Sequence, residues 1–197
     1  VIGRGLELSQ IFNNLGMVYF SQRKYTASRE AYQQALSCKE IEDNQHDQTL
    51  FSWNLAEVEM RLSGFENTSK ILQKLSPLPQ NFQDILLEAD VDWLKGDLNA
   101  LEGHFEEAKE NYRRCFENEQ RKAEALAKLA RLENDLALAQ EAMKLAPTPS
   151  SEAALHFVKG DYERAREVIA NTGDTFEEAR LLLDAAYITG KDSYKVT

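Results

Sequence analysis

The chain has 197 residues, of which 43% are hydrophobic, and its formal net charge is −10. This length and composition suffice for a sizeable core or a stacked array of small units, so the chain need not be disordered. The acidity argues against nucleic-acid phosphates and anionic membranes as partners. The low proline and glycine content (4 and 9 residues) and the abundance of Leu, Ala, Glu, Lys and Gln favour helices over strands. The composition predicts an all-α protein that binds a neutral or basic protein surface or uses its surplus Glu for solubility.

Cysteine usage and hydropathy bear on the compartment. Cys38 and Cys115 are far apart, and no clustered Cys/His spacing indicates a zinc site or a disulfide framework. No run approaches the ~18 apolar residues that span a bilayer, and the N-terminus lacks the layout of a signal peptide. We expect a cytoplasmic protein without cofactor or metal. Because the chain starts at Val1, we also expect it to be an excerpt of a longer protein.

Residues 13–36 are the first stretch in which small residues interrupt a strongly helical pattern. Gly16 and Ser28 lie among large apolar residues on either side of the polar turn SQRKY. Glycine costs roughly 1 kcal/mol relative to alanine inside a helix, so its presence there usually has a packing reason. The pattern predicts two antiparallel helices in close backbone contact at Gly16 and Ser28.

The same pattern recurs with a period of 40 residues. Four sets of positions keep this interval: Gly16, Ala56 and Gly96; Ser28, Thr68 and Ala108; Tyr32, Leu72 and Tyr112; and Tyr25, Phe65 and Phe105. Each member of the last set opens a second helix after a short turn. The repeats predict a close helix contact at Gly16, Gly96 and Ala108, and a buried, unreactive Cys115.

The C-terminal half continues the pattern less regularly. Residues 123–147 predict an Ala- and Leu-rich helix pair, and residues 150–171 another pair with a turn at Gly160 and Asp161. The final helix, about 175–189, has an apolar stripe that we expect to pack on residues 161–171 and to favour self-association through its outward face. The stripe consists of Phe176, Ala179, Leu182, Leu183 and Ala186.

These units resemble the tetratricopeptide repeat family. Phe12, Leu15, Gly16, Tyr19, Ser28, Tyr32 and Ala35 follow the family pattern closely. The second unit departs from it at Glu59 and Thr68, while the third keeps Gly96, Phe105, Ala108 and Tyr112. The resemblance implies one all-α, right-handed superhelical array of about five helix pairs and a final helix, with units at 7–40, 47–76, 82–117, 119–147, 150–171 and 175–189. A HEAT-like array is the structural alternative.

The 40-residue interval is longer than the usual repeat of ~34 residues. The additional residues fall in the connections SCKEIEDNQHDQ and SPLPQNFQD. Longer helices or longer loops are both compatible with them.

The sequence contains no recognisable catalytic arrangement. His46, His104 and His156 have no nucleophile or acid at a recurring spacing, and no phosphate-binding glycine loop occurs. We therefore expect no enzyme. The resemblance implies a protein-binding scaffold that recognises a peptide or helix in the concave groove lined by the first helix of each pair. The alternative is a regulatory or sensor region that controls an attached effector domain, such as a transcription activator or an enzyme.

The candidate groove residues come from the first helices. They are Met17, Phe20, Trp53, Glu57, Met60, Trp93 and Asp97. Only Arg61 is basic among the neighbouring groove positions, which argues against a carboxylate clamp. Trp53 and Trp93 lie 40 residues apart, and two alternatives stay open for both: packing in the core, or aromatic anchors in the groove. In the groove, each Trp with the acid one turn later would suit a basic, apolar peptide.

Overall fold

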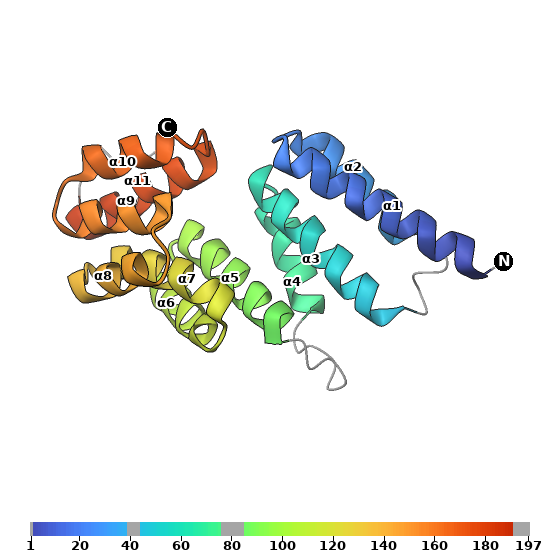
Figure 1. Cartoon of the computed structure of the whole chain (residues 1–197), viewed down its shortest axis with the longest axis horizontal. Coiled ribbons are helices and arrows are strands. Elements are labelled where there is room, and N and C mark those ends of the chain that lie inside the picture. Colours follow the sequence, from blue (N-terminus) through green and yellow to red (C-terminus); the bar gives the residue numbers. More distant parts are fainter. Residues whose placement is uncertain (1, 39–43, 76–84, 191–197) are drawn as a thin grey trace. The chain divides into compact units, whose positions relative to one another are not determined.

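The computed structural model describes residues 2–38, 44–75 and 85–190, and its regular elements in these ranges are helices (Figure 1). The chain divides into two compact units, Val1–Leu87 and Glu88–Thr197. The predicted all-α class is confirmed, because the helices follow one another as short-turn pairs throughout the described residues.

The first unit contains two helix pairs. Helices α1 (Ile2–Ser21) and α2 (Tyr25–Ser37) form the first pair, and α3 (Gln45–Arg61) and α4 (Phe65–Lys74) form the second. Each helix packs against the next one along the chain. Ala35 and Phe51 form a buried core on which Phe12, Leu36 and Leu50 pack. This core joins α1, α2 and α3.

The second unit consists of consecutive pairs and a last helix. Its helices are α5 (Ile85–Leu101), α6 (Phe105–Arg114), α7 (Glu119–Glu133), α8 (Leu136–Leu145), α9 (Pro149–Val158), α10 (Tyr162–Ala170) and α11 (Thr175–Thr189). A 3-10 turn, Cys115–Glu117, follows α6. Side-chain caps such as Asn118 before α7 and Asp174 before α11 satisfy N–H groups of the first helical turn. They set where the first helix of each later pair begins.

The predicted close contact at the small residues is confirmed. A Cβ atom on Gly96 would lie 2.5 Å from Cε1 of Tyr112, and one on Gly16 would overlap the ring of Tyr32 in the same way. Ser28 is fully buried, and its hydroxyl donates a 2.8 Å hydrogen bond to the carbonyl of Gly16. The second helix of the pair therefore places a tyrosine ring where the first helix has no side chain.

The second and third repeats form the same helix contact with different residues. The Thr68 hydroxyl donates to the carbonyl of Ala56 at 3.3 Å, as Ser28 does to Gly16. Ala108 at the equivalent place in the third repeat is fully buried and has no hydroxyl. Alanine or glycine on the first helix and a small residue on the second thus keep the two backbones close in all three repeats.

Some of the additional residues in the 40-residue repeat interval are part of a first helix. Helix α3 begins at Gln45, so the last residues of the connection SCKEIEDNQHDQ are helical. Asn44 caps this start, because its side-chain oxygen accepts a 3.1 Å hydrogen bond from the backbone N–H of Asp47. Residues 39–43 and 76–84, which make up most of the remaining connections, lie outside the described residues.

Helix α11 packs on α10, as predicted, but with a different set of residues. Leu181 and Ala185 are fully buried against α9 and α10, whereas Leu182 and Leu183 of the predicted stripe are only half-buried. The apolar stripe is therefore rotated by about one residue, or roughly 100° of helix. This rotation follows from the charged residues of α11, which take up an adjoining face.

We expect the two cysteines to differ sharply in reactivity. Cys115 is fully buried, its thiol contacts the carbonyls of Ala89 and Asn111 at 3.4 Å each, and burial raises the pKa of Cys115 to about 12. Cys38 is half-buried at the end of α2. In the native protein a disulfide reagent such as DTNB should label Cys38 alone at neutral pH and at pH ~9. Labelling of Cys115 at the same rate as Cys38 would contradict the buried environment.

Candidate functional site

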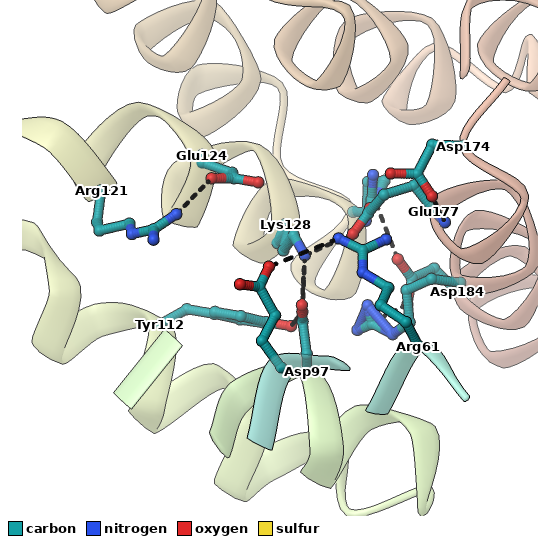
Figure 2. Close-up of polar contacts among 12 residues, drawn as sticks. Arg61, Asp97, Tyr112, Arg121, Glu124, Lys128, Asp174, Glu177 and Asp184 are labelled. Carbon is teal, nitrogen blue, oxygen red and sulfur yellow. Dashed lines mark hydrogen bonds and ion pairs between the residues drawn. The ribbon is translucent and has the colours of Figure 1, made fainter. Parts of the chain in front are cut away.

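Six charged side chains from three helices of the second unit meet in its interior. Figure 2 labels four of them, Asp97, Lys128, Glu177 and Asp184. Asp97 comes from α5, Lys128 and Arg131 from α7, and Glu177, Arg180 and Asp184 from α11. All are fully buried except Glu177, whose side chain is 13% exposed. We call this group the buried charge cluster.

Lys128 is the centre of the cluster. Its Nζ donates to both carboxylate oxygens of Asp97 at 2.7 Å and to Glu177 at 2.9 Å (Figure 2). Burial by itself disfavours the ammonium, but the facing carboxylates outweigh it and raise the pKa of Lys128 above its ordinary value. The lysine is therefore a fixed cation that links α5 and α11 through α7.

Two arginines form the other half of the cluster around Asp184. Arg131 donates from Nε to Asp184 at 2.8 Å, and its guanidinium lies 3.9 Å from Glu177. Arg180, one turn before Asp184 on α11, pairs with the same carboxylate at 3.1 Å. The two α7 residues of the cluster, Lys128 and Arg131, thus each face an acidic residue of α11.

Aromatic residues enclose the side of the cluster formed by α5 and α6. The Tyr112 hydroxyl donates a 2.6 Å hydrogen bond to Asp97, and burial raises the pKa of Tyr112 well above its ordinary value. The Trp93 ring lies 4.3 Å from Nζ of Lys128 and 4.8 Å from the guanidinium of Arg121. Cations over an indole face are a favourable arrangement. Trp93 and Asp97, both predicted site residues, are thus brought together by Lys128.

The first unit gathers a second group of predicted residues. The Arg61 guanidinium lies over the ring of Phe20 at 5.9 Å, and it also pairs with Glu57 at 4.0 Å. Met17, on α1, is 53% exposed. Phe20, Glu57 and Met17 therefore lie on α1 and α3, the first helices of their pairs.

The predicted site residues fall into a buried group and a solvent-accessible group. Trp53 is 8% exposed, Trp93 3%, Met60 1% and Asp97 0%, whereas Met17 is accessible and Phe20 and Glu57 are half-buried. Both tryptophans therefore have buried rings, and that of Trp93 contacts charged side chains as well as the core.

Lys128, Arg131, Arg180 and Asp184 were not among the predicted site residues. A signal for them is present in the sequence: Lys128 and Arg131 interrupt the apolar run ALAKLARL, and Arg180 and Asp184 flank the leucines of ARLLLDAA. A charge on the apolar face of an amphipathic helix has to be paired when buried. The pairing partners are distant in sequence, so the pattern alone does not identify them.

The tryptophan environment leads to a fluorescence prediction. Because both indole rings are almost completely buried, we expect a blue-shifted emission and little quenching by iodide in the free protein, compared with a free tryptophan derivative. A Trp53→Phe variant reports Trp93 alone, and a Trp93→Phe variant reports Trp53 alone. Strong iodide quenching in either variant would contradict the buried position of the remaining ring.

Metal-binding clusters and membrane-spanning helices are both absent from the described residues. These residues contain no group of three or more His, Cys, Asp or Glu side chains that could hold a metal ion. None of the helices in these ranges is long and apolar enough to cross a membrane.

Comparison with known proteins bears on the family. A family model described as tetratricopeptide repeat matches residues 9–40 and 93–121. No curated protein and no solved structure matches the chain. The matched segments contain the two glycine–tyrosine contacts, Gly16 with Tyr32 and Gly96 with Tyr112. Together with the helix pairs around them, these matches identify residues 9–40 and 93–121 as tetratricopeptide repeats, so the chain contains repeats of this family.

Proposed function

We propose that the chain is a non-catalytic protein-binding module that recognises a peptide or helix of a partner protein on the face lined by its first helices. Proteins of this family are interaction modules and generally act as scaffolds. The observation that carries the proposal is that Met17, Phe20 and Glu57 belong to the first helices α1 and α3 and retain solvent exposure, and that Arg61 contacts both Phe20 and Glu57.

The chemistry of these residues suits an apolar peptide with a basic residue. Met17 and Phe20 offer apolar surface, and methionine adapts to differently shaped partners. Glu57 supplies the acid, since its carboxylate already faces a cation, the guanidinium of Arg61, at 4.0 Å. Trp53 and Met60 are buried residues of α3 in the same unit and complete the proposed set there, while Trp93 and Asp97 of α5 are its members in the second unit.

The proposal is tested by peptide binding with matched surface variants. Amphipathic basic peptides are titrated into the full chain and binding is followed by fluorescence anisotropy. Met17→Ala should weaken binding about fivefold or more, because an exposed apolar contact at a binding site is lost. Leu145→Ala is the control, since Leu145 is 51% exposed on the second helix α8. Equal effects of both substitutions, or no peptide binding at all, would refute this site.

We also propose self-association through the terminal helices, and a cytoplasmic location. Leu8, Ile11, Leu15 and Val18 of α1 are 38–59% exposed and follow the spacing of one helix face. No charged residue occurs between Leu8 and Gln22, so two copies of this face would meet without repulsion. Light scattering of the chain and of Ile11→Glu tests this, with a monomer expected for the variant only. The cytoplasmic location is supported by the low cysteine content, two in 197 residues, because small secreted domains are often rich in disulfides.

A second candidate function, a regulatory region that controls an attached effector domain, is favoured by one observation. Helix α11 covers part of the first-helix face of the second unit, because it contacts α7 as well as α10. A binding surface that is covered from within the chain is suited to control by a partner. Comparing the activity of a full-length protein before and after partner binding would test this role.

A further inference from the structure

Helix α11 has two faces of different chemistry. Glu177, Arg180, Asp184 and Tyr187 are spaced three, four and three residues apart, which places them on one side of the helix. Leu181 and Ala185 lie on the adjoining side and are fully buried against α9 and α10. The apolar side is what the next helix of a repeat array needs, because each repeat packs on its neighbour.

The charged side makes contacts that a stacking helix does not need. Glu177 pairs with Lys128 of α7 at 2.9 Å (Figure 2). Asp184 pairs with Arg131, also of α7, at 2.8 Å. Tyr187 stacks on Phe105, at the start of α6, with 3.8 Å between ring centroids. Helix α11 therefore reaches back beyond its neighbouring pair, to α7, the first helix of the fourth repeat, and to the start of α6, the second helix of the third repeat.

The ionic character of this contact distinguishes it from ordinary core packing. A buried ion pair pays a large desolvation penalty, and apolar residues of similar volume often stabilise as well or better. The hydrogen bonding of the surface is also incomplete: among the described residues, neither terminal nitrogen of Arg131 has a hydrogen-bond acceptor. A helix that supplied acceptors for these Arg131 donors would compete with α11 for the same place.

We propose that α11 occupies the surface formed by Asp97, Lys128 and Arg131 as an internal ligand, and that this surface binds a partner helix with the same stripe. The stripe is an acid, a base three residues later, an acid seven residues later and an aromatic residue ten residues later. This inference rests on the proposed protein-binding function and names the partner class for the second unit.

Release of α11 is feasible because part of its contact with the array is exposed. Tyr187 is 38% exposed and the Glu177 side chain 13%, and local opening costs less free energy where the contacts are less buried. While attached, it competes at an effective concentration in the millimolar range, so an external helix binds weakly to the intact chain. Weakening the attached copy should therefore strengthen binding of an unmodified external copy.

The experiment uses a fluorescein-labelled peptide of residues 172–190 and full-length chains. In Tyr187→Ala the attached helix loses its stacking contact with Phe105 while the buried charges stay in place, and Tyr187 is itself 38% exposed. Glu177→Gln is a second variant that weakens the pair with Lys128. Leu136→Ala, at an exposed residue of α8, is the matched control. Hydrogen exchange over residues 175–189 verifies that α11 opens more often in the two weakened chains.

We expect the peptide to bind the Tyr187→Ala and Glu177→Gln chains about tenfold more tightly than the unmodified chain and the Leu136→Ala control. A peptide with Glu177→Lys and Asp184→Lys should not bind. Equal affinity for all four chains, or binding of the charge-reversed peptide, would overturn the inference. Neither outcome bears on the binding of a basic, apolar peptide through Met17. The internal-ligand proposal for α11 and the proposed protein-binding site on α1 and α3 are therefore tested independently.

Discussion

Replacing Lys128 by methionine should lower the free energy of unfolding by about 3–5 kcal/mol, since removing one partner leaves buried carboxylates without compensation. Lys128 and Asp97 are both fully buried, and Glu177 is nearly so. Methionine keeps most of the volume and the flexibility of the lysine stem, so the loss reports on the charge. Denaturant titration followed by circular dichroism measures it.

Lys70→Met is the matched control, because Lys70 and Glu66 form an ion pair of 2.6 Å in which both side chains are solvent-exposed. Exposed ion pairs contribute little, so this substitution should leave stability almost unchanged. A double variant, Lys128→Met with Asp97→Asn, should regain part of the loss because one of the unpaired charges is removed. Equal stability of the Lys128→Met and Lys70→Met chains would contradict the buried position of the cluster.

The pH dependence of this contribution has a definite sign. The pKa of Lys128 is raised in the folded protein above the ordinary value of 10.5. A group with a raised pKa contributes stability that is fully present below its unfolded pKa and is lost as the pH rises through its folded pKa. Deprotonation of Lys128 should therefore not reduce the stability difference between the unmodified and Lys128→Met chains until the pH exceeds about 10.5. Loss of that difference at neutral pH would show that Lys128 is not held as a cation.

Replacing Gly16 by leucine should cost ~1–3 kcal/mol or more through overpacking, even though glycine is the poorer helix former. A side chain at this position meets the ring of Tyr32, which is 2% exposed and has little room to move. Ala108→Leu should be destabilising for the same reason, because Ala108 is fully buried. Thermal unfolding measures both losses.

A substitution cycle separates the steric effect from helix propensity. Gly96→Ala should destabilise the chain, and the loss should shrink in a Tyr112→Leu background, where the opposing ring is absent. Asn14→Ala, at an exposed position of α1, is the control in which only propensity changes. If Gly96→Ala stabilised the protein as Asn14→Ala does, the close contact would be wrong.

Local signals in the sequence were sufficient for the helix pairs and their contacts. Gly16 and Gly96 sit in helical sequence at a fixed interval, and the tyrosines opposite them keep the same interval. Periodicity is a property of neighbouring residues, so it identifies a helix, its partner and the small residues between them. The final helix was predicted with its observed bounds, but its apolar side was rotated because Arg180 and Asp184 were not recognised as buried.

What the sequence by itself determined is therefore the class, the repeat and the place of each glycine–tyrosine contact. Only the tertiary structure decided which charges are buried and which residues they pair with. Lys128 pairs with Asp97 and Glu177, which are 31 and 49 residues away along the chain. A charged residue in a helical pattern has the same local signature whether it faces solvent or a distant carboxylate. The free energy that separates the two cases comes from desolvation and pairing across helices, which no local pattern contains.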